Sequence, residues 1–131
     1  NKVLEAAAGS DVQLYVSTFY QEGGSPEFDE GIKAWLNEDA TAMTNNGGND
    51  TIAAVTAMGY DAYYVALEAL KAAGSTDPAA VKAALPGVTY TGVTGDIAFD
   101  DIGDAIRDTA YIKVADTANN AWALETMQKA G

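Results

Sequence analysis

The sequence contains no cysteine and no histidine among its 131 residues. Without cysteine, the chain can form neither a disulfide nor a thiolate metal site. Without histidine, it lacks the commonest general base and the commonest ligand of transition metals. Both absences count against catalysis and against a transition-metal centre.

Basic residues are scarce as well, with 7 Lys and Arg against 19 Asp and Glu and a formal net charge of −12. Such a chain repels phosphate backbones and anionic membranes, which argues against nucleic-acid binding. No apolar run approaches the ~20 residues that a bilayer-spanning helix needs. A hydrophobic fraction of 48% is nevertheless too high for a disordered acidic tail. We therefore expect a folded chain of about one domain.

The remaining routes to catalysis also have little support in the sequence. No serine lies in a Gly-x-Ser-x-Gly motif, and neither Gly-Gly pair is followed by the Lys-Ser/Thr of a phosphate-binding loop. No pair of carboxylates stands in an apolar setting that would raise one pKa. We predict no catalytic residue, no metal site and no cofactor.

Hydrophobic patterns predict three elements in the first third of the chain. Residues 2–8 are typical of the end of a helix, and residues 12–17 alternate like a strand with Val12, Leu14 and Val16 on one face. Ser25 can cap the next helix, and Pro26 suits its first position. The apolar residues of that helix are spaced to share one face: Phe28, Ile32, Trp35 and Leu36.

The longest helical pattern runs from Asp50 to Ala73 and ends at Gly74, in the preferred C-cap position. We expect its apolar stripe to be buried, with Asp61 and Glu68 on the opposite face. This stripe is rich in small residues: Ile52, Val55, Gly59, Ala62, Tyr63, Ala66 and Leu70.

The second half of the sequence predicts a short helix followed by strands. Asp77 and Pro78 repeat the cap-and-proline pattern, and the helix they begin extends through Leu85. Residues 116–131 have a mixed pattern that predicts a short helix or a tail. Three strand-like pieces lie in between: 88–90, 93–99 and 105–114.

An acidic cluster after the second of these pieces has two interpretations. Asp100, Asp101 and Asp104 around Gly103 could form a calcium loop or a turn. A calcium loop of the EF-hand type needs alternate ligands over twelve residues and a closing glutamate, whereas Ile102 occupies the middle here. The flanking strands favour a turn, in which Asp caps and Gly supplies a positive φ. The run TNNGGND at 44–50 likewise predicts a loop ending in a helix cap rather than a metal site.

Aromatic residues gather at the end of the first predicted strand, where open α/β folds bind ligands. Tyr15, Phe19 and Tyr20 could contact a ligand or simply pack at the strand edge. The tyrosines of the long helix are expected to pack against other elements: Tyr60, Tyr63 and Tyr64.

Four pieces of the chain stand in a distinctive order. They are VLEAAAGSDVQLYVSTFY, SPEFDEGIKAWLN, MGYDAYYVALEALKAAGSTDPAAVKAAL and VTGDIAFDDIGDAIRDTAYIKV. In this order and spacing they resemble the C-terminal part of the type I periplasmic binding proteins, the leucine/isoleucine/valine-binding family of receptors that feed ABC transporters. The third piece is the most specific, and together the pieces span nearly all of residues 2–115.

The resemblance implies an α/β fold that is an incomplete part of the type I periplasmic-binding-protein fold: a Rossmann-like lobe with a C-terminal β-hairpin. Residues 1–131 would be the C-terminal third of a two-lobed receptor. Its parts would be a hinge-crossing strand at about 10–20, lobe helices at 25–85, a hairpin at 88–115 and a tail at 116–131.

The resemblance also implies an extracytoplasmic receptor, periplasmic or lipid-anchored at the bacterial cell surface, that closes on a small molecule such as an amino acid. The implied partners are the ligand, an ABC transporter permease and the remainder of the receptor chain. Only Thr18, Phe19 and Tyr20 carry over as candidate ligand-binding residues.

Two hypotheses follow. In the first, the chain is a fragment that does not bind ligand alone, because the helix at 2–8 lacks a beginning and the strand at 12–17 has no neighbouring strand. In the second, it is a self-contained structural or interaction domain, perhaps domain-swapped, built on receptor-derived sequence.

Overall fold

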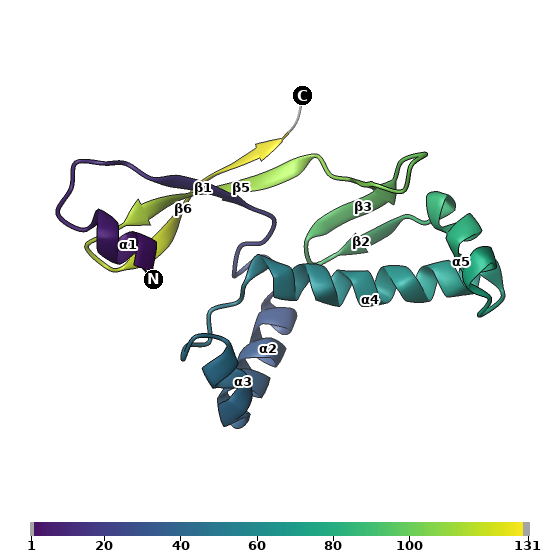
Figure 1. Cartoon of the computed structure of the whole chain (residues 1–131), viewed down its shortest axis with the longest axis horizontal. Helices are drawn as coiled ribbons and strands as arrows, with labels where there is room; N and C mark the ends of the chain where they lie inside the picture. The colour runs from purple at the N-terminus through teal and green to yellow at the C-terminus, as the bar shows by residue number, and fades with distance from the viewer. Residues whose placement is uncertain (1, 130–131) are drawn as a thin grey trace. The chain divides into compact units, whose positions relative to one another are not determined.

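A computed structural model describes residues 2–129 of the chain. The chain divides into two compact units, drawn in Figure 1. Unit 1 combines residues 1–21 with residues 108–131, and unit 2 contains residues 22–107. The backbone therefore passes from one unit to the other twice, at 21/22 and at 107/108.

Unit 1 is a three-stranded antiparallel sheet with one short helix. The sheet has the order β1-β5-β6. Tyr15 pairs with Val114 in one ladder, and Thr109 pairs with Lys129 in the other. The elements of this unit are α1 (Lys2–Ala7), β1 (Tyr15–Thr18), β5 (Thr109–Asp116) and β6 (Ala121–Lys129).

Two expectations for unit 1 are wrong. Residues 121–129 form the longest strand described, not a helix or tail. The strand forms because its backbone groups pair with β5, and this pairing cannot be predicted from the local sequence. The first strand begins at Tyr15 rather than at Val12. Val12 and Val16 are exposed, at 59% and 39%. Apolar burial in the helix of this unit rests on Leu4 and Ala7.

Unit 2 packs helices against a small antiparallel sheet of order β2-β3-β4. Its helices are α2 (Pro26–Glu38), α3 (Ala40–Asn45), α4 (Ala54–Ala73) and α5 (Pro78–Ala84), followed by the 3-10 turn η1 (Leu85–Gly87). Its strands are β2 (Tyr90–Gly92), β3 (Gly95–Phe99) and β4 (Ala105–Ile106). The core joins α4 to the sheet through four buried residues: Val65, Ala69, Val88 and Ile97. Among the described residues, no helix is long and apolar enough to cross a membrane.

Several helix ends follow the sequence closely. Gly74 ends α4 in the left-handed conformation at φ 58°, and the Asp77 carboxylate accepts the Ala80 amide at 3.0 Å. Ser25 stands at the N-cap of α2 but makes no side-chain cap bond, so that expectation is wrong. Trp35 also departs from the expected buried face and is 55% exposed.

The buried face of α4 differs from the expected stripe. Most of the stripe is exposed, with Val55 at 73% and Tyr63 at 62%, whereas Ile52, which precedes the helix, is buried. The helix instead buries residues spaced four apart: Ala57, Asp61, Val65 and Ala69. This corrects the expectation for Asp61, which is fully buried although it was placed opposite the apolar stripe.

Hydrogen bonds to the turn between β2 and β3 explain this orientation. One oxygen of the Asp61 carboxylate accepts the Val93 amide at 2.9 Å, and the other accepts the Thr94 amide at 2.8 Å. The Thr94 hydroxyl donates a third bond to the same carboxylate. A buried carboxylate needs such donors, since leaving it unsatisfied would cost several kcal/mol.

Gly92 permits this close approach of α4 to the hairpin. A Cβ atom at Gly92 would overlap the Asp61 carboxylate, whereas a Cβ at Gly87 would meet no atom within 4 Å.

We therefore predict that Gly92→Ala lowers the free energy of unfolding by about 1–3 kcal/mol, the usual cost of overpacking. The Gly87→Ala control should change it by less than about 1 kcal/mol. Urea unfolding followed by circular dichroism at the helical band reports on α2 to α5. Equal midpoints for the two variants would contradict the predicted overlap.

Candidate functional site

The three residues expected to contact a ligand lie at the end of β1, just before the chain leaves unit 1. Thr18 pairs with Tyr111 of β5 and is half-buried. Phe19 is 42% exposed, whereas Tyr20 is only 3% exposed. The fold thus brings them together as consecutive residues at a crossing point, and their contact with a ligand stays a prediction.

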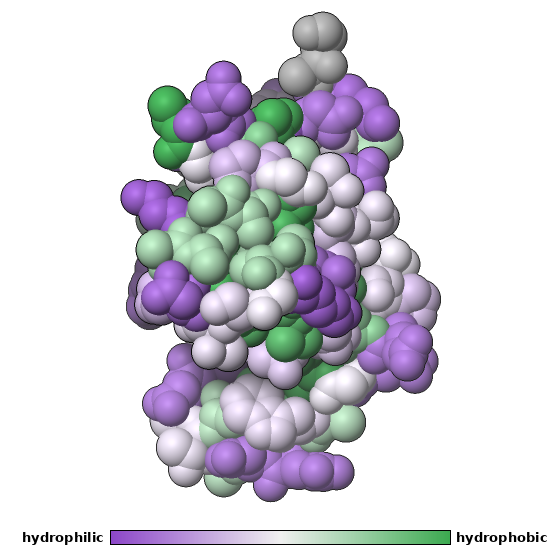
Figure 2. Space-filling model, turned by 90° about the vertical axis from the view of Figure 1, so that its right-hand side faces the viewer, coloured by the Kyte–Doolittle hydropathy of each residue, from purple (hydrophilic) through white to green (hydrophobic). Residues whose placement is uncertain are grey.

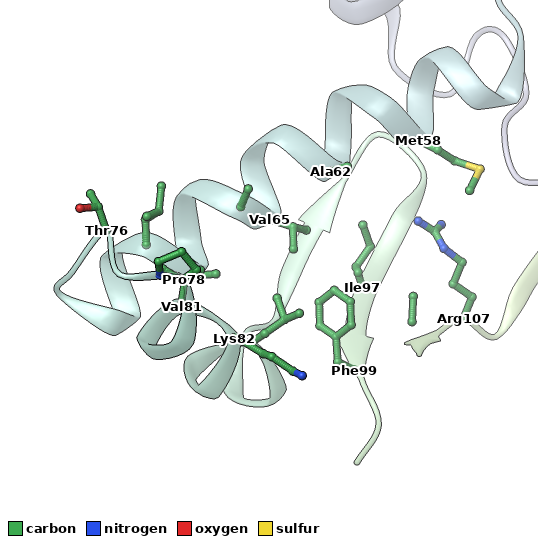
Figure 3. Close-up of a pocket in the computed structure, with 15 residues that line it drawn as sticks. Met58, Ala62, Val65, Thr76, Pro78, Val81, Lys82, Ile97, Phe99 and Arg107 are labelled. Atoms are coloured by element: carbon green, nitrogen blue, oxygen red, sulfur yellow. The ribbon is translucent and has the colours of Figure 1, made fainter. Parts of the chain in front are cut away.

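Unit 2 contains a groove that the sequence did not predict. It has a volume of about 720 Å³, within the range of small-molecule sites. Val65 of α4 and both Ile97 and Phe99 of β3 point into it, as Figure 3 shows. The small residues Ala62 and Ala66 line its helical side and are the only local signal that could have indicated it.

The surroundings of the groove are mostly apolar. Ala72 at the end of α4 and both Ala79 and Ala83 of α5 are exposed. Figure 2 shows a weakly hydrophobic, pale green area on the face of the molecule that it draws. Lys82 and Arg107 contribute the two basic side chains of the lining. Apart from Thr76, Lys82 and Arg107 the lining is apolar, so the groove is suited to packing against an apolar surface.

Helix α4, which lines the groove, also contributes tyrosines to a cluster of aromatic rings. The Tyr60 ring lies 4.9 Å from both Phe28 and Tyr64, and Tyr64 stacks on Tyr90 at 5.9 Å. The expected packing role is therefore confirmed for Tyr60 and Tyr64. Tyr63 meets Tyr64 edge-on but remains largely exposed.

Contacts within this cluster suppress tyrosine ionisation. A hydrogen bond from the Tyr60 hydroxyl to the Tyr64 hydroxyl, at 3.4 Å, is the main cause that raises the pKa of Tyr60 to about 12. Burial, followed by the charge of Asp61, raises the pKa of Tyr90. Ionisation of Tyr60 and of Tyr90 therefore requires a higher pH than that of an ordinary tyrosine.

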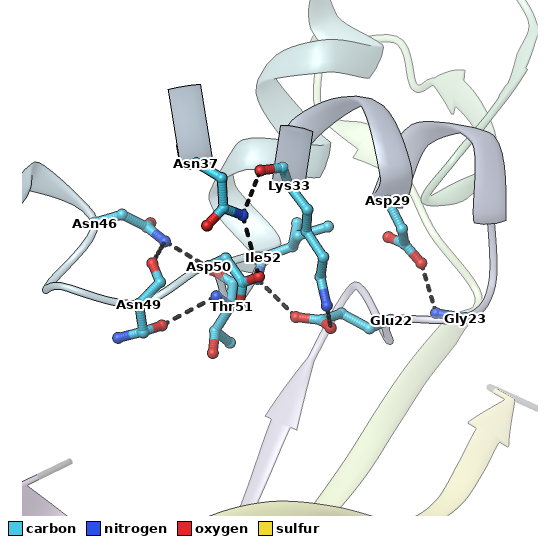
Figure 4. Close-up of polar contacts among 10 residues, drawn as sticks. All are labelled: Glu22, Gly23, Asp29, Lys33, Asn37, Asn46, Asn49, Asp50, Thr51 and Ile52. Atoms are coloured by element: carbon cyan, nitrogen blue, oxygen red, sulfur yellow. Dashed lines mark hydrogen bonds and ion pairs between the residues drawn. The ribbon is translucent and has the colours of Figure 1, made fainter. Parts of the chain in front are cut away.

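A polar network holds the chain where it enters unit 2, as Figure 4 shows. The Glu22 carboxylate accepts the Ile52 amide and the Lys33 ammonium, both at 2.7 Å. The buried Asp29 carboxylate accepts the Gly23 amide at 2.7 Å. The bond to Glu22 raises the pKa of Lys33. Sequence reasoning missed this network, because Glu22 and Ile52 are thirty residues apart.

The asparagine-rich loop at 44–50 bonds to itself. The Asn46 side chain donates to the carbonyls of Asn49 and Thr51 at 2.7 and 3.0 Å. Asp50 accepts from Asn37 at 3.4 Å instead of capping α4, so the expected cap is wrong.

The acidic cluster forms the turn that the sequence favoured. One Asp100 carboxylate oxygen accepts the amides of Ile102 and Asp104, at 3.0 and 2.8 Å, and Gly103 adopts φ 93°. Strands β3 and β4 pair on either side. Within residues 2–129, no group of three or more acidic side chains is placed to hold a metal ion.

Calcium should therefore leave the melting temperature unchanged, because the Asp100 carboxylate is already occupied by backbone amides. Thermal unfolding across a millimolar calcium series, with magnesium as the matched control, measures this. A saturable stabilisation by calcium that Asp100→Asn removes would establish the alternative metal loop.

Replacing Tyr64 by phenylalanine should lower the pKa of Tyr60 from about 12 toward its ordinary value of 10.0, because the main cause of the shift is removed. The measurement is a pH titration of ¹³Cζ tyrosine resonances. Tyr63→Phe is the control, since the Tyr63 ring meets the Tyr64 ring edge-on. An unchanged Tyr60 titration in Tyr64→Phe would exclude the hydroxyl bond as the cause.

Comparison with known proteins gives a match to one sequence family and similarity to solved structures. The sequence model of the periplasmic binding protein family matches residues 1–119. Among solved structures, the chain is similar to the leucine-binding protein LivK of Thermotoga maritima, with a TM-score of 0.66 and 24% sequence identity. That match covers 98% of this chain and 34% of LivK, so the chain spans about a third of that protein's length. No curated protein matches the sequence.

These matches confirm the expected fold class. The described helices and antiparallel sheets are an α/β part of the type I periplasmic-binding-protein fold, and the structural similarity extends over nearly the whole chain. Since the family match includes more than nine-tenths of the residues, the chain belongs to the periplasmic binding protein family.

Proposed function

We propose that the chain is the C-terminal third of an extracytoplasmic receptor that binds an amino-acid-like solute and delivers it to the permease of an ABC transporter. The observation that carries this proposal is the match of 98% of the chain to 34% of a leucine-binding protein. The receptor is periplasmic or lipid-anchored. Its role is binding without catalysis, in keeping with a sequence that contains no histidine and no cysteine.

The division into units supports a two-lobed receptor. The chain supplies a part of each of two units and crosses between them twice. Receptors that close by a hinge need such crossings, because the two bodies must move while remaining covalently joined. Thr18, Phe19 and Tyr20 lie beside the first crossing and are our candidates for ligand contact.

The exposed face of α4 supports the remainder of the receptor as a partner. An apolar stripe that contains Val55 and Tyr63, together with the groove of about 720 Å³ beside it, lies open in this chain. Exposed apolar areas of this kind usually mark a surface that another chain segment or protein covers. The preceding two thirds of a receptor of LivK's length would provide such a cover.

The proposal is tested with two proteins, the natural gene product and the 131-residue chain. We expect the intact mass of the natural product to exceed that of the chain about threefold, in line with the 34% coverage of LivK. Leucine, isoleucine or valine at one hundred times its Kd should stabilise the natural product by about 2.7 kcal/mol. The isolated chain should show no thermal shift, because it lacks most of the receptor.

Four results would count against the proposal. A natural product of 131 residues would exclude the fragment. An amino acid that stabilises the isolated chain would show that this part binds alone. A natural product that no amino acid stabilises would exclude the ligand class, and a stable dimer of the isolated chain by light scattering would favour the domain-swapped alternative.

A further inference from the structure

Asn46 is the only asparagine in the sequence that is followed by glycine. The Asn46-Gly47 pair lies in the loop at 44–50, which has no part in the function proposed above. Asparagine is one of the thermolabile residues of proteins. Glycine has no side chain to shield its backbone nitrogen, so that nitrogen can attack the side chain of a preceding asparagine. This pair is therefore a candidate site of chemical modification by deamidation.

Deamidation at this pair would be an exchange of bonds within the chain followed by hydrolysis. The Gly47 backbone nitrogen gives its proton to a solvent base and bonds to Cγ of Asn46. The bond from Cγ to Nδ2 breaks, and Nδ2 takes up a proton from solvent and leaves as ammonia. Water then adds to one of the two carbonyls of the five-membered ring and breaks the bond of that carbonyl to nitrogen, which gives aspartate or isoaspartate. Water is the one co-reactant, and Gly47 is exposed to it.

The folded loop holds the attacking nitrogen away from its target. Asn46 adopts φ −82° and ψ 14°. At this ψ the Gly47 nitrogen is nearly eclipsed with the backbone nitrogen of Asn46 about the Cα–C bond. Ring closure needs it eclipsed with Cβ, which is roughly a third of a turn away because Cα is tetrahedral. The Asn46-Gly47 peptide must therefore rotate before the reaction can occur.

Hydrogen bonds oppose this rotation at both reacting nitrogens. The Gly47 amide donates to the Thr44 carbonyl at 3.1 Å. The leaving nitrogen, Nδ2 of Asn46, donates to the carbonyls of Asn49 and Thr51 at 2.7 and 3.0 Å, as Figure 4 shows. These bonds close the loop around the reacting pair. Local opening of the loop is consequently the step that precedes ring closure.

The modified side chain could not rebuild the same loop. A carboxylate at residue 46 has no proton to donate, and its oxygens would face the two carbonyl oxygens that the amide now bonds. Isoaspartate would also add one atom to the backbone at the C-cap of α3. Because the lost bonds join this C-cap to the segment that leads into α4, the modification loosens the connection between these helices.

We propose that Asn46 is a deamidation site that the folded loop at 44–50 keeps closed, so that its conversion to aspartate or isoaspartate proceeds through local opening of the loop. Each conversion is irreversible, since ammonia is lost, and removes two hydrogen bonds between α3 and the start of α4. This inference concerns residues of unit 2 alone and does not depend on the proposed receptor function.

The experiment uses the full 131-residue chain, incubated at mildly alkaline pH either folded or unfolded in urea. Peptide mapping by mass spectrometry measures aspartate and isoaspartate at every asparagine. In urea, Asn46 should convert faster than every other asparagine. In the folded chain it should convert about tenfold or more slowly, because its hydrogen bonds must open first. Equal rates in the two states, or faster conversion of another asparagine in urea, would overturn the proposal.

Asn49→Ala tests the role of loop opening. Oδ1 of Asn49 accepts the Thr51 amide at 3.0 Å, and its Nδ2 donates to the Gly47 carbonyl at 3.4 Å. Loss of these bonds should speed the conversion of Asn46 in the folded chain and leave the rate in urea unchanged. Asn119→Ala, the matched control in the turn between β5 and β6, should change neither rate. A folded-state rate in Asn49→Ala equal to that of the control would contradict the requirement for opening.

Asn46→Asp tests the consequence of the modification. Hydrogen exchange of the Gly47 and Gly48 amides, which donate to carbonyls of α3, should accelerate about tenfold or more as the loop loosens. Asn45→Asp is the matched control, because it adds the same charge one residue earlier and keeps the donors of Asn46. Equal acceleration in the two variants would show that charge alone acts and would refute the role given to the Asn46 bonds.

Discussion

The carboxylate of Asp61 organises unit 2. It is fully buried on α4 and accepts three hydrogen bonds from the turn between β2 and β3. Burying a carboxylate is favourable only when its lone pairs are satisfied, so the helix has one rotation and one distance from the hairpin at which the contact works. Gly92 makes that distance possible, because any larger residue would overlap the carboxylate. These hydrogen bonds hold the hairpin against α4, and the apolar core forms there from Val65, Ala69, Val88 and Ile97.

That orientation decides which surfaces remain open. When α4 turns Asp61 inward, its stripe of small and aromatic residues faces outward, and the groove between α4, α5 and β3 is left open. The Asp61 carboxylate is also linked to Arg107, the last residue of unit 2, because the Thr94 hydroxyl donates to Asp61 and accepts from Arg107. One buried carboxylate thereby connects the packing of the core, the exposed apolar surface of α4 and one of the two points where the chain leaves unit 2.

Much of the local structure could be predicted from the sequence. The capping carboxylate of Asp77, the left-handed Gly74 and the turn at Asp100 depend on residues within a few positions of one another, and each was confirmed. The candidate site was harder to predict from the sequence. Its neighbourhood at the end of β1 followed from family resemblance, but the groove and the Glu22 network depend on contacts between distant segments. Periodicity could not orient α4, because small apolar residues occur around the whole helix and no single face is distinctive.

The sequence by itself determined which side-chain chemistry the protein has and most of its helices, turns and strands. The chain has neither cysteine nor histidine and carries a net charge of −12, and its ordered motifs indicated a binding-protein family. Tertiary structure decided the buried face of α4, the strand at 121–129 and the hydrogen bonds of Glu22 and Arg107. The physical reason is the range of the interactions: caps and turns are closed by neighbouring residues, whereas strand pairing and the satisfaction of a buried carboxylate require partners that only the folded chain brings within reach.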